Sequence, residues 1–160
     1  MYNYIRVESP VGMLTLAEED GALTVLVLDG QKYFDQHLNG EGKECETEPL
    51  RLARLWLDAY FAGKAPETSA LPLAPRGTAF QRRVWQELQA IPYGQTTSYG
   101  KLAEVLGSSP RAVGSAVGHN PLSILIPCHR VLAADGSLTG YAGGLENKKK
   151  LLQLEGVLPR

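Results

Sequence analysis

A proline- and glycine-rich segment between residues 63 and 77 divides this chain of 160 residues into two parts with different patterns. The segment is bounded by two glycines and holds three prolines, and residues of these kinds interrupt helices and strands. A chain of this length forms one compact domain or two small ones. We therefore predict one domain over residues 1–70 and a second over residues 71–160.

The first part has the pattern of short strands followed by a helix. Residues 2–8, 12–17 and 22–28 read as strands, separated by turn sequences that contain glycine. Residues 39–48 are polar and acidic, which predicts a loop. The apolar residues that follow recur at helical spacing; they are Leu52, Leu55, Trp56, Ala59 and Tyr60.

The second part is mainly helical in pattern. Thr78 and Gln81 fit a capping box, and the helix that they begin ends before Pro92. A short helix ending at Gly107 and another beginning at Pro110 follow. The fold class is therefore α/β (α+β): a small N-terminal antiparallel sheet with a helix, joined to a mainly helical C-terminal domain.

The last two of these helices, with their short glycine-containing turn, have the layout of a helix-turn-helix. The second of them carries small residues, among them Ala112 and Gly114, although each glycine weakens a helix by about 1 kcal/mol. A face of small residues suits tight packing against another helix. It equally suits close approach to a nucleic-acid groove, with Arg111 at the leading end.

Charge divides unevenly between the two parts. Residues 1–71 hold six Lys/Arg and twelve Asp/Glu, a net charge of −6, whereas residues 72–160 hold ten and five, a net charge of +5. This asymmetry indicates that the second part meets an anionic partner, although uneven surface charge is the plainer interpretation.

Several classes of protein find no support in the sequence. No apolar stretch approaches the roughly 18 residues that span a bilayer. The start lacks the regions of a signal peptide, so we expect a cytoplasmic protein, or a nuclear one in a eukaryote. Two cysteines are too few for a disulfide framework. Since neither zinc-ligand spacing nor a phosphate-binding glycine motif occurs, we expect no metal and no cofactor.

The apolar run over residues 124–132 is interrupted by a thiol, an imidazole and a guanidinium in succession. The run reads as a buried strand, where unpaired polar groups are costly. Pro127 removes a backbone donor, so the strand should end or bend there and present Cys128 in a pocket. We interpret Cys128 as a nucleophile rather than a buried small hydrophobe. Arg130 could instead hold the two halves together through a buried ion pair.

A nucleophilic Cys128 needs activation, because a free thiol has a pKa of about 8.5. His129 is the obvious base, but neighbouring side chains of an extended segment point to opposite faces. Either the backbone bends here or a water relays the proton. A third group should orient the imidazole, and both Glu155 and Asp135 are suitable.

The chain resembles the O6-alkylguanine-DNA alkyltransferases, which repair DNA by direct reversal. Pro127-Cys128-His129-Arg130 is similar to the active-site tetrapeptide of that family. The resemblance extends over residues 78–156, whereas the first 70 residues match only in general shape. Its other motifs are Phe80-Gln81, Val84-Trp85, Ile91-Pro92-Tyr93-Gly94, Thr97-Ser98-Tyr99, Arg111-Ala112-Val113-Gly114, Asn120-Pro121, Tyr141-Ala142-Gly143-Gly144-Leu145 and Glu155-Gly156.

The resemblance implies that Cys128 takes the alkyl group from O6 of guanine by in-line displacement. His129 would act through a water, Glu155 would orient His129, and Asn120 would brace the turn before the active-site strand. The thioether product has no evident leaving route, so the protein would act once. The second domain would bind DNA and carry out the transfer, and the protein would be a monomer.

The resemblance also assigns residues to duplex DNA and the flipped nucleotide. Arg111 would fill the vacated stack, while Ala112 and Gly114 would enter the minor groove. Side chains and backbone groups of four further residues would contact the base or its phosphate; these residues are Tyr99, Val131, Tyr141 and Ala142. We expect His119 and the run Lys148-Lys149-Lys150 to be solvated, with a contact to DNA as the alternative for both, and Cys45 to have no role.

Three other functions compete with this prediction. A cysteine hydrolase would need turnover, and hence a water route to its intermediate. A module that recognises alkylated bases without reacting would not require Cys128. A helix-turn-helix regulator with Cys128 as its sensor would need dimer symmetry and a defined operator.

Overall fold

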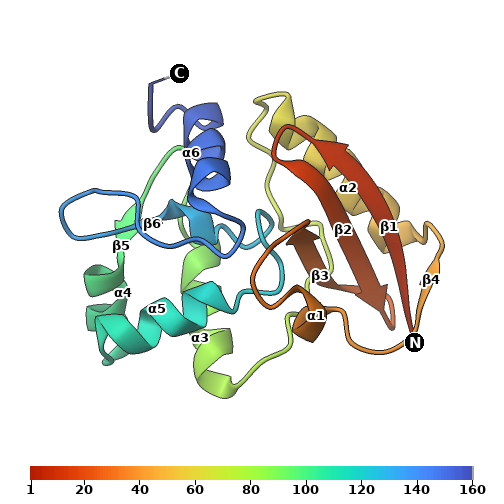
Figure 1. Ribbon diagram of the computed structural model, residues 1–160, viewed down its shortest axis with the longest axis horizontal. Helices are drawn as coiled ribbons and strands as arrows, with labels where there is room; N and C mark the ends of the chain where they lie inside the picture. The colour runs from red at the N-terminus through yellow and green to blue at the C-terminus, as the bar shows by residue number, and fades with distance from the viewer. Residues whose placement is uncertain (160) are drawn as a thin grey trace.

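The N-terminal part of the chain forms a four-stranded sheet in the order β3-β2-β1-β4 (Figure 1). The computed structural model describes residues 1–159. The three predicted strands are confirmed, and β2 pairs antiparallel with both β1 and β3. Their bounds are β1 (Tyr2–Ser9), β2 (Gly12–Glu19) and β3 (Ala22–Leu28).

The three predicted strands are antiparallel as expected, but the sheet has a fourth, parallel strand within residues 39–48, where a loop was predicted. β4 (Gly42–Glu44) pairs parallel with the start of β1. A side chain at Gly42 would collide with the ring of Tyr2. All three residues of β4 are exposed, so the strand has no buried face and leaves no apolar alternation to read. The single turn α1 (Phe34–His37), which also has no buried residue, was missed for the same reason.

The predicted helix of the first part is α2 (Glu48–Phe61), which packs on the sheet (Figure 1). It begins four residues before the first apolar residue that we had assigned to its inner face. Leu55, predicted to face the core, is 45% exposed. The buried side of the helix consists of Leu50, Ala53, Trp56, Leu57 and Tyr60.

The segment predicted as a linker is fixed along the edge of β3. The Leu23 amide donates to the carbonyl of Pro72 at 2.7 Å, and the Ala74 amide donates back to Leu23 at 2.8 Å. Farther along the same strand, the Leu26 amide donates to Pro121 at 2.8 Å. Backbone hydrogen bonds therefore tie the sheet to two later segments, and one buried core includes residues of both parts.

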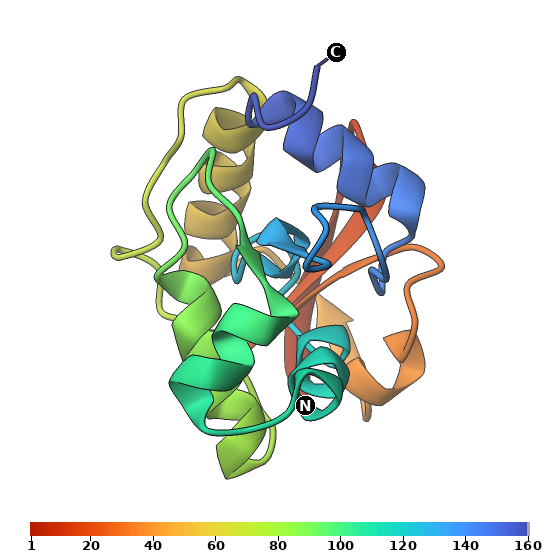
Figure 2. The ribbon, with the colours of Figure 1, turned by 90° about the vertical axis from the view of Figure 1, so that its left-hand side faces the viewer.

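The predicted helix-turn-helix is present, with its two helices side by side (Figure 2). Gly107 adopts the left-handed conformation that ends the first helix, at φ 64°. Side chains of Ser98 and Ser109 cap the two helices, and the capping box of Thr78 and Gln81 begins the preceding one. The elements of this region are α3 (Ala79–Gln89), β5 (Thr97–Ser98), α4 (Tyr99–Leu106) and α5 (Pro110–Gly118).

The apolar run over residues 124–132 is not the predicted strand. Ile124 has a left-handed φ of 72° and begins a buried turn, after which residues 128–130 form a 3-10 helix. The chain then continues as the two-residue strand β6 (Val131–Leu132), which pairs parallel with β5, and as helix α6 (Leu145–Leu154). The run is apolar because Ile124, Leu125 and Ile126 are buried in the core, which gives a turn the composition of a strand.

Candidate active site

Cys128 begins the 3-10 helix and lies at a cavity of about 440 Å³. The residue is only 4% exposed, so its thiol is within the wall of the cavity and not on the outer surface. The chain bends after Pro127, as the proline predicted. Residues of both parts of the chain line the cavity: Lys32, Tyr33, Tyr99, Gly114, Ser115, Val117, Gly118, His119, Cys128, Gly140, Tyr141, Ala142 and Leu145.

A buried carboxylate holds His129, the residue that follows Cys128 in the 3-10 helix. Oε2 of Glu155 is 2.5 Å from Nε2 of His129 and accepts the hydroxyl of Tyr60 at 2.6 Å. Oε1 accepts Nε of Arg130 at 2.8 Å and the amide of Gly94 at 3.1 Å. The side chains of His129 and Glu155 are both inaccessible to solvent.

Of the two carboxylates that the sequence offered, the structure places Glu155 against the imidazole. Asp135 is exposed and accepts the amide of Ser137. Arg130 forms the buried ion pair that we had considered, but it joins the 3-10 helix to Glu155 within the second part of the chain. The contact from the first part comes instead from Tyr60, which the sequence did not single out for the site.

Burial and ion pairing determine the charge states of Glu155 and His129. Burial raises the pKa of Glu155, but the hydrogen bond of His129, the charge that His129 carries when it is protonated, and the hydrogen bonds of Arg130 and Tyr60 outweigh it and hold that pKa at about 2. Burial also lowers the pKa of His129 more than its partner Glu155 raises it. An ionised carboxylate only accepts hydrogen bonds, so a neutral His129 donates from Nε2 and keeps Nδ1 as an acceptor. Nδ1 has no hydrogen-bond partner on residues 1–159.

Asn120 fixes the chain between α5 and the 3-10 helix. Its Nδ2 donates to the carbonyl of Ile126 at 2.8 Å, and its Oδ1 accepts the amide of Leu122 at 3.0 Å. Burial raises the pKa of Cys128, and the Asn120 side chain and the cation of Lys148 act against that rise. The thiol is therefore held protonated at rest beside groups that favour its ionised form.

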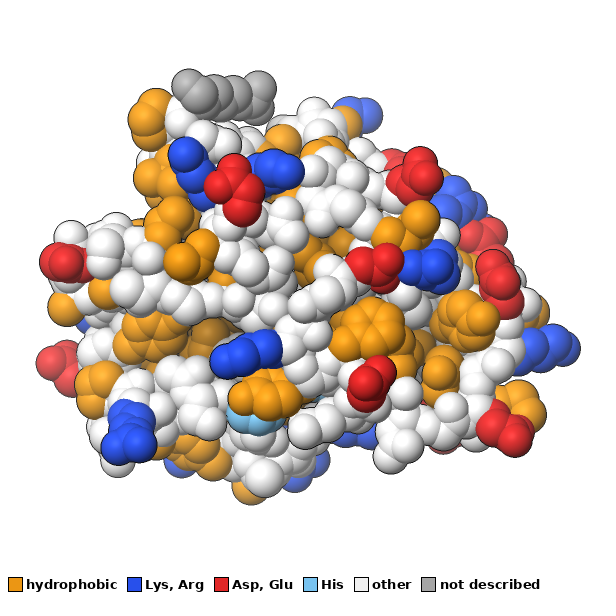
Figure 3. Space-filling model, viewed as in Figure 1, with side chains coloured by type: hydrophobic (Ala, Val, Ile, Leu, Met, Phe, Trp, Pro, Cys, Tyr) orange, Lys and Arg blue, Asp and Glu red, His pale blue; other side chains and the backbone are white. Residues whose placement is uncertain are grey.

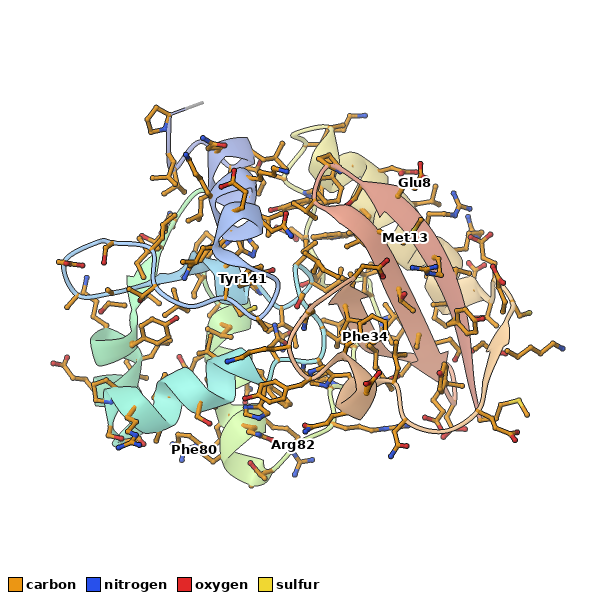
Figure 4. The ribbon with its side chains drawn as sticks, viewed as in Figure 1. Glu8, Met13, Phe34, Phe80, Arg82 and Tyr141 are labelled. Atoms are coloured by element: carbon orange, nitrogen blue, oxygen red, sulfur yellow. The ribbon has the colours of Figure 1, made fainter. Side chains whose placement is uncertain are left out.

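The residues that sequence reasoning assigned to DNA and base separate into two groups. Tyr99, Gly114, Tyr141 and Ala142 line the cavity together with Cys128, and Figure 4 shows Tyr141 in the loop that leads to α6. Arg111, Ala112 and Val131 do not line it. Arg111 is exposed at the start of α5, and Ala112, beside it, is half-buried. Val131 is fully buried, but its carbonyl is 2.6 Å from Nζ of Lys148.

Lys148 is a correction to the prediction of a solvated lysine run. Its side chain is completely buried, whereas Lys149 and Lys150 are exposed as expected. Its position, three residues before the buried Leu151 and four before the buried Leu152, puts it on the inner side of α6. Such placement on the helix was the one available signal.

The N-terminal part contributes a wall of the cavity that the sequence gave no reason to expect. The amide of Lys32 donates to the carbonyl of Ala142 at 2.9 Å. The ring of Tyr33 stacks on that of His119, with centroids 4.0 Å apart and planes inclined by 17°. His119 is thus half-buried against an aromatic ring, contrary to our expectation of a solvated histidine.

Residues 1–159 contain no group of three or more His, Cys, Asp and Glu side chains that could hold a metal ion. Within the same residues, no helix is long and apolar enough to cross a membrane. Cys45 is free and exposed.

Models of two protein-family domains match the chain almost from end to end. The "6-O-methylguanine DNA methyltransferase, ribonuclease-like domain" matches residues 1–75. The "6-O-methylguanine DNA methyltransferase, DNA binding domain" matches residues 79–157.

Curated proteins and a solved structure are similar over nearly the whole chain. The methylated-DNA–protein-cysteine methyltransferase of Mycolicibacterium paratuberculosis is 48% identical, over 97% of this chain and 93% of the relative. The constitutive one of Bacillus subtilis is 42% identical, over 98% and 97%. The crystal structure of Mycobacterium tuberculosis OGT in complex with DNA is 44% identical, with a TM-score of 0.85 over 96% of this chain and 92% of that one.

Proposed function

Because the chain belongs to the 6-O-methylguanine DNA methyltransferase family, we propose that it repairs DNA by moving the alkyl group of O6-alkylguanine onto its own Cys128. The observation that carries this proposal is the buried thiol at a cavity, followed in the same 3-10 helix by His129, which Glu155 holds. The same cavity is lined by Gly114 of the helix-turn-helix, which connects the reactive atom to the DNA-binding element.

The arrangement supports a proton path from thiol to imidazole. Nδ1 of the neutral His129 acts as a base, and a water between it and Sγ of Cys128 relays the proton. Glu155 accepts from Nε2 and stabilises the imidazolium that forms. The thiolate, not the thiol, is the effective nucleophile, so this path generates the reactive species only when it is needed.

The transfer itself is a displacement at the alkyl carbon. Sγ of Cys128 forms a bond to carbon as the bond from carbon to O6 breaks, and the electron pair of that bond stays on guanine. The guanine then takes up one proton, so the alkyl group and the thiol proton have exchanged places. A thioether has no good leaving group, and each chain therefore acts once.

We infer that the base reaches Cys128 by leaving the duplex. A target atom inside the helix is out of reach, and flipping costs a few kcal/mol, less for a damaged base. Ala112 and Gly114 of α5 approach the minor groove, and the exposed Arg111 occupies the place of the base. Tyr99, Tyr141, the amide of Ala142 and the carbonyl of Val131 hold the flipped base.

Charge and the division of the chain fit this assignment. Residues 72–160 carry a net charge of +5, which attracts phosphates of any sequence. Most acidic side chains visible in Figure 3 lie over the N-terminal sheet instead.

We propose that residues 71–160 perform DNA binding and transfer while residues 1–70 support them. We also infer a monomer that acts in the cytosol, where its thiol stays reduced.

The stoichiometry of repair tests this function. A duplex with a single O6-methylguanine should lose it in proportion to the protein added, with a plateau at one lesion per chain. Cys128→Ser should remove no lesion, while Cys45→Ser, which changes an exposed thiol outside the site, should behave as the wild type. Repeated turnover would exclude self-alkylation and favour a thiol hydrolase.

A further inference from the structure

Tyr60 is a buried tyrosine of the first part of the chain that touches both members of the pair formed by His129 and Glu155. Its hydroxyl donates to Oε2 of Glu155 at 2.6 Å and lies 3.4 Å from Nε2 of His129. The tyrosine has no exposed surface, and neither do the side chains of the pair. Because α2, the helix that carries Tyr60, packs on the N-terminal sheet, this contact crosses from one part of the chain to the other.

Aromatic packing fixes the position of this hydroxyl. The ring of Tyr60 stacks on that of Trp56, with centroids 5.3 Å apart and planes inclined by 11°. Phe61 and Tyr93 meet it edge-on, with centroids at 5.1 Å and 6.0 Å. The indole of Trp56 is itself held, since its Nε1 donates to the carbonyl of Glu67 at 3.0 Å. The hydroxyl of Tyr60 can therefore leave the carboxylate only if this aromatic cluster rearranges.

The carboxylate of Glu155 has donors on both oxygens, and the hydroxyl of Tyr60 is one of those on Oε2. Arg130 binds both oxygens, with Nε at 2.8 Å from Oε1 and Nη2 at 3.1 Å from Oε2. Gly94 and His129 also belong to the second part of the chain. A buried oxygen that loses a donor is left unsatisfied. Without the hydroxyl, we expect the carboxylate to turn toward the guanidinium, its strongest remaining partner, and away from the imidazole.

The hydroxyl of Tyr60 also bears on the position of the proton on His129. Burial and the charge of Glu155 raise the pKa of Tyr60 far above its ordinary value, so the hydroxyl keeps its proton and donates it to Oε2. Its oxygen is then a second acceptor near Nε2 of His129, in addition to Oε2 itself. The hydrogen bond made by one ring nitrogen decides which nitrogen carries the proton. Two oxygens beside Nε2 therefore keep the proton there and leave Nδ1 as the base.

We propose that Tyr60 is a positioning residue for alkyl transfer, whose hydroxyl holds Oε2 of Glu155 against Nε2 of His129 so that Nδ1 remains available as the base. The inference rests on the proposed function of Cys128 and extends it. A nucleophile and its base are commonly oriented by a third group, which here is Glu155. Tyr60 orients that third group, so the first part of the chain supplies a member of the proton path as well as support.

The rate of a single methyl transfer at saturating duplex tests this role. Tyr60→Phe keeps the ring and its packing and removes the hydroxyl alone. Tyr93→Phe is the matched control, because the neighbouring tyrosine also loses a hydroxyl, but one that donates to the carbonyl of Leu154 at 3.2 Å. Rates are expressed per active chain, counted from the methyl groups taken up at the end point, so a loss of folded protein does not enter the comparison.

We expect Tyr60→Phe to lower the rate constant on the order of tenfold, the equivalent of about 1.4 kcal/mol of activation free energy. The duplex concentration that gives half the maximal rate should not change. A free alkylated guanine should show the same factor, because Tyr60 acts on the chemistry of the thiol and not on DNA binding. Tyr93→Phe should match the wild type on both substrates.

A merely structural role for Tyr60 would lower stability and the number of active chains, but it would leave the rate per active chain at the wild-type value. That result, a loss confined to duplex DNA, or an equal loss in Tyr93→Phe would each overturn the role of Tyr60 alone. Failure of the wild type to take up a methyl group would overturn the proposed function and this inference with it.

Discussion

Replacing Glu155 with glutamine removes the negative charge that holds His129 and Arg130, while it keeps the shape of the side chain. The carboxylate accepts hydrogen bonds from His129, Arg130, Tyr60 and Gly94, all within 3.1 Å. Breaking a buried ion pair by removing one partner costs about 3–5 kcal/mol. We expect Glu155→Gln to lower the free energy of unfolding at pH 7 by about that amount.

The pH dependence of stability gives an independent value for the free energy that the ionised Glu155 contributes. The pKa of Glu155 is 4.5 without the fold and about 2 within it, which corresponds to about 3 kcal/mol of stability. Because the folded pKa is depressed, this stability is present above pH 4.5 and is lost as the pH falls toward 2. By pH 3, about 2 kcal/mol of it should be gone.

Urea unfolding followed by tryptophan fluorescence measures both effects, because Trp56 and Trp85 are buried. The difference between wild type and Glu155→Gln should be largest near pH 7 and should shrink by about 2 kcal/mol at pH 3. Other carboxylates titrate in both proteins and cancel in the difference. A difference that is the same at pH 7 and pH 3 would refute an ionised Glu155 as the source of the stability.

Three further substitutions test other parts of the account. Tyr60→Phe removes a hydrogen bond to a buried carboxylate and should lower the unfolding free energy by about 1.5–3 kcal/mol in the same urea assay. Asn120→Ala leaves the buried carbonyl of Ile126 without its 2.8 Å donor and should cost about 1–3 kcal/mol or more. Arg111→Ala changes an exposed residue, so stability should stay within about 0.5 kcal/mol. Its repair of duplex DNA should fall on the order of tenfold in a lesion-removal assay, since flipping costs a few kcal/mol. Its reaction with a free alkylated guanine should be unchanged, and an equal loss on both substrates would contradict base replacement by Arg111.

Elements with local signals were predictable from the sequence. Three local signals each identify their element within a few residues: the capping box at Thr78, the left-handed Gly107, and the glycine-containing turns between the first three strands. The short exposed elements β4 and α1 carry no such signal, because nothing on them is buried. The apolar run before Cys128 was wrongly predicted as a strand for the opposite reason. Because this turn is buried on all sides, its residues are as apolar as those of a buried strand.

The site divides in the same way. Cys128 and His129 stand out because reactive groups interrupt an apolar run. The choice of Glu155 over Asp135 depends on α6 packing against the 3-10 helix, which residue spacing does not encode. Tyr60, Tyr33 and Lys148 reach the site from three separate elements, so only the tertiary structure brings them there.

The mass of the intact protein after reaction with a duplex that contains one O6-methylguanine shows whether Cys128 takes up the alkyl group. We predict a gain of one methyl group in place of one hydrogen, saturating at one per chain and located on Cys128 by peptide mapping. An unchanged mass with the lesion still in the bound duplex, or a methyl group on another residue, would contradict self-alkylation of Cys128.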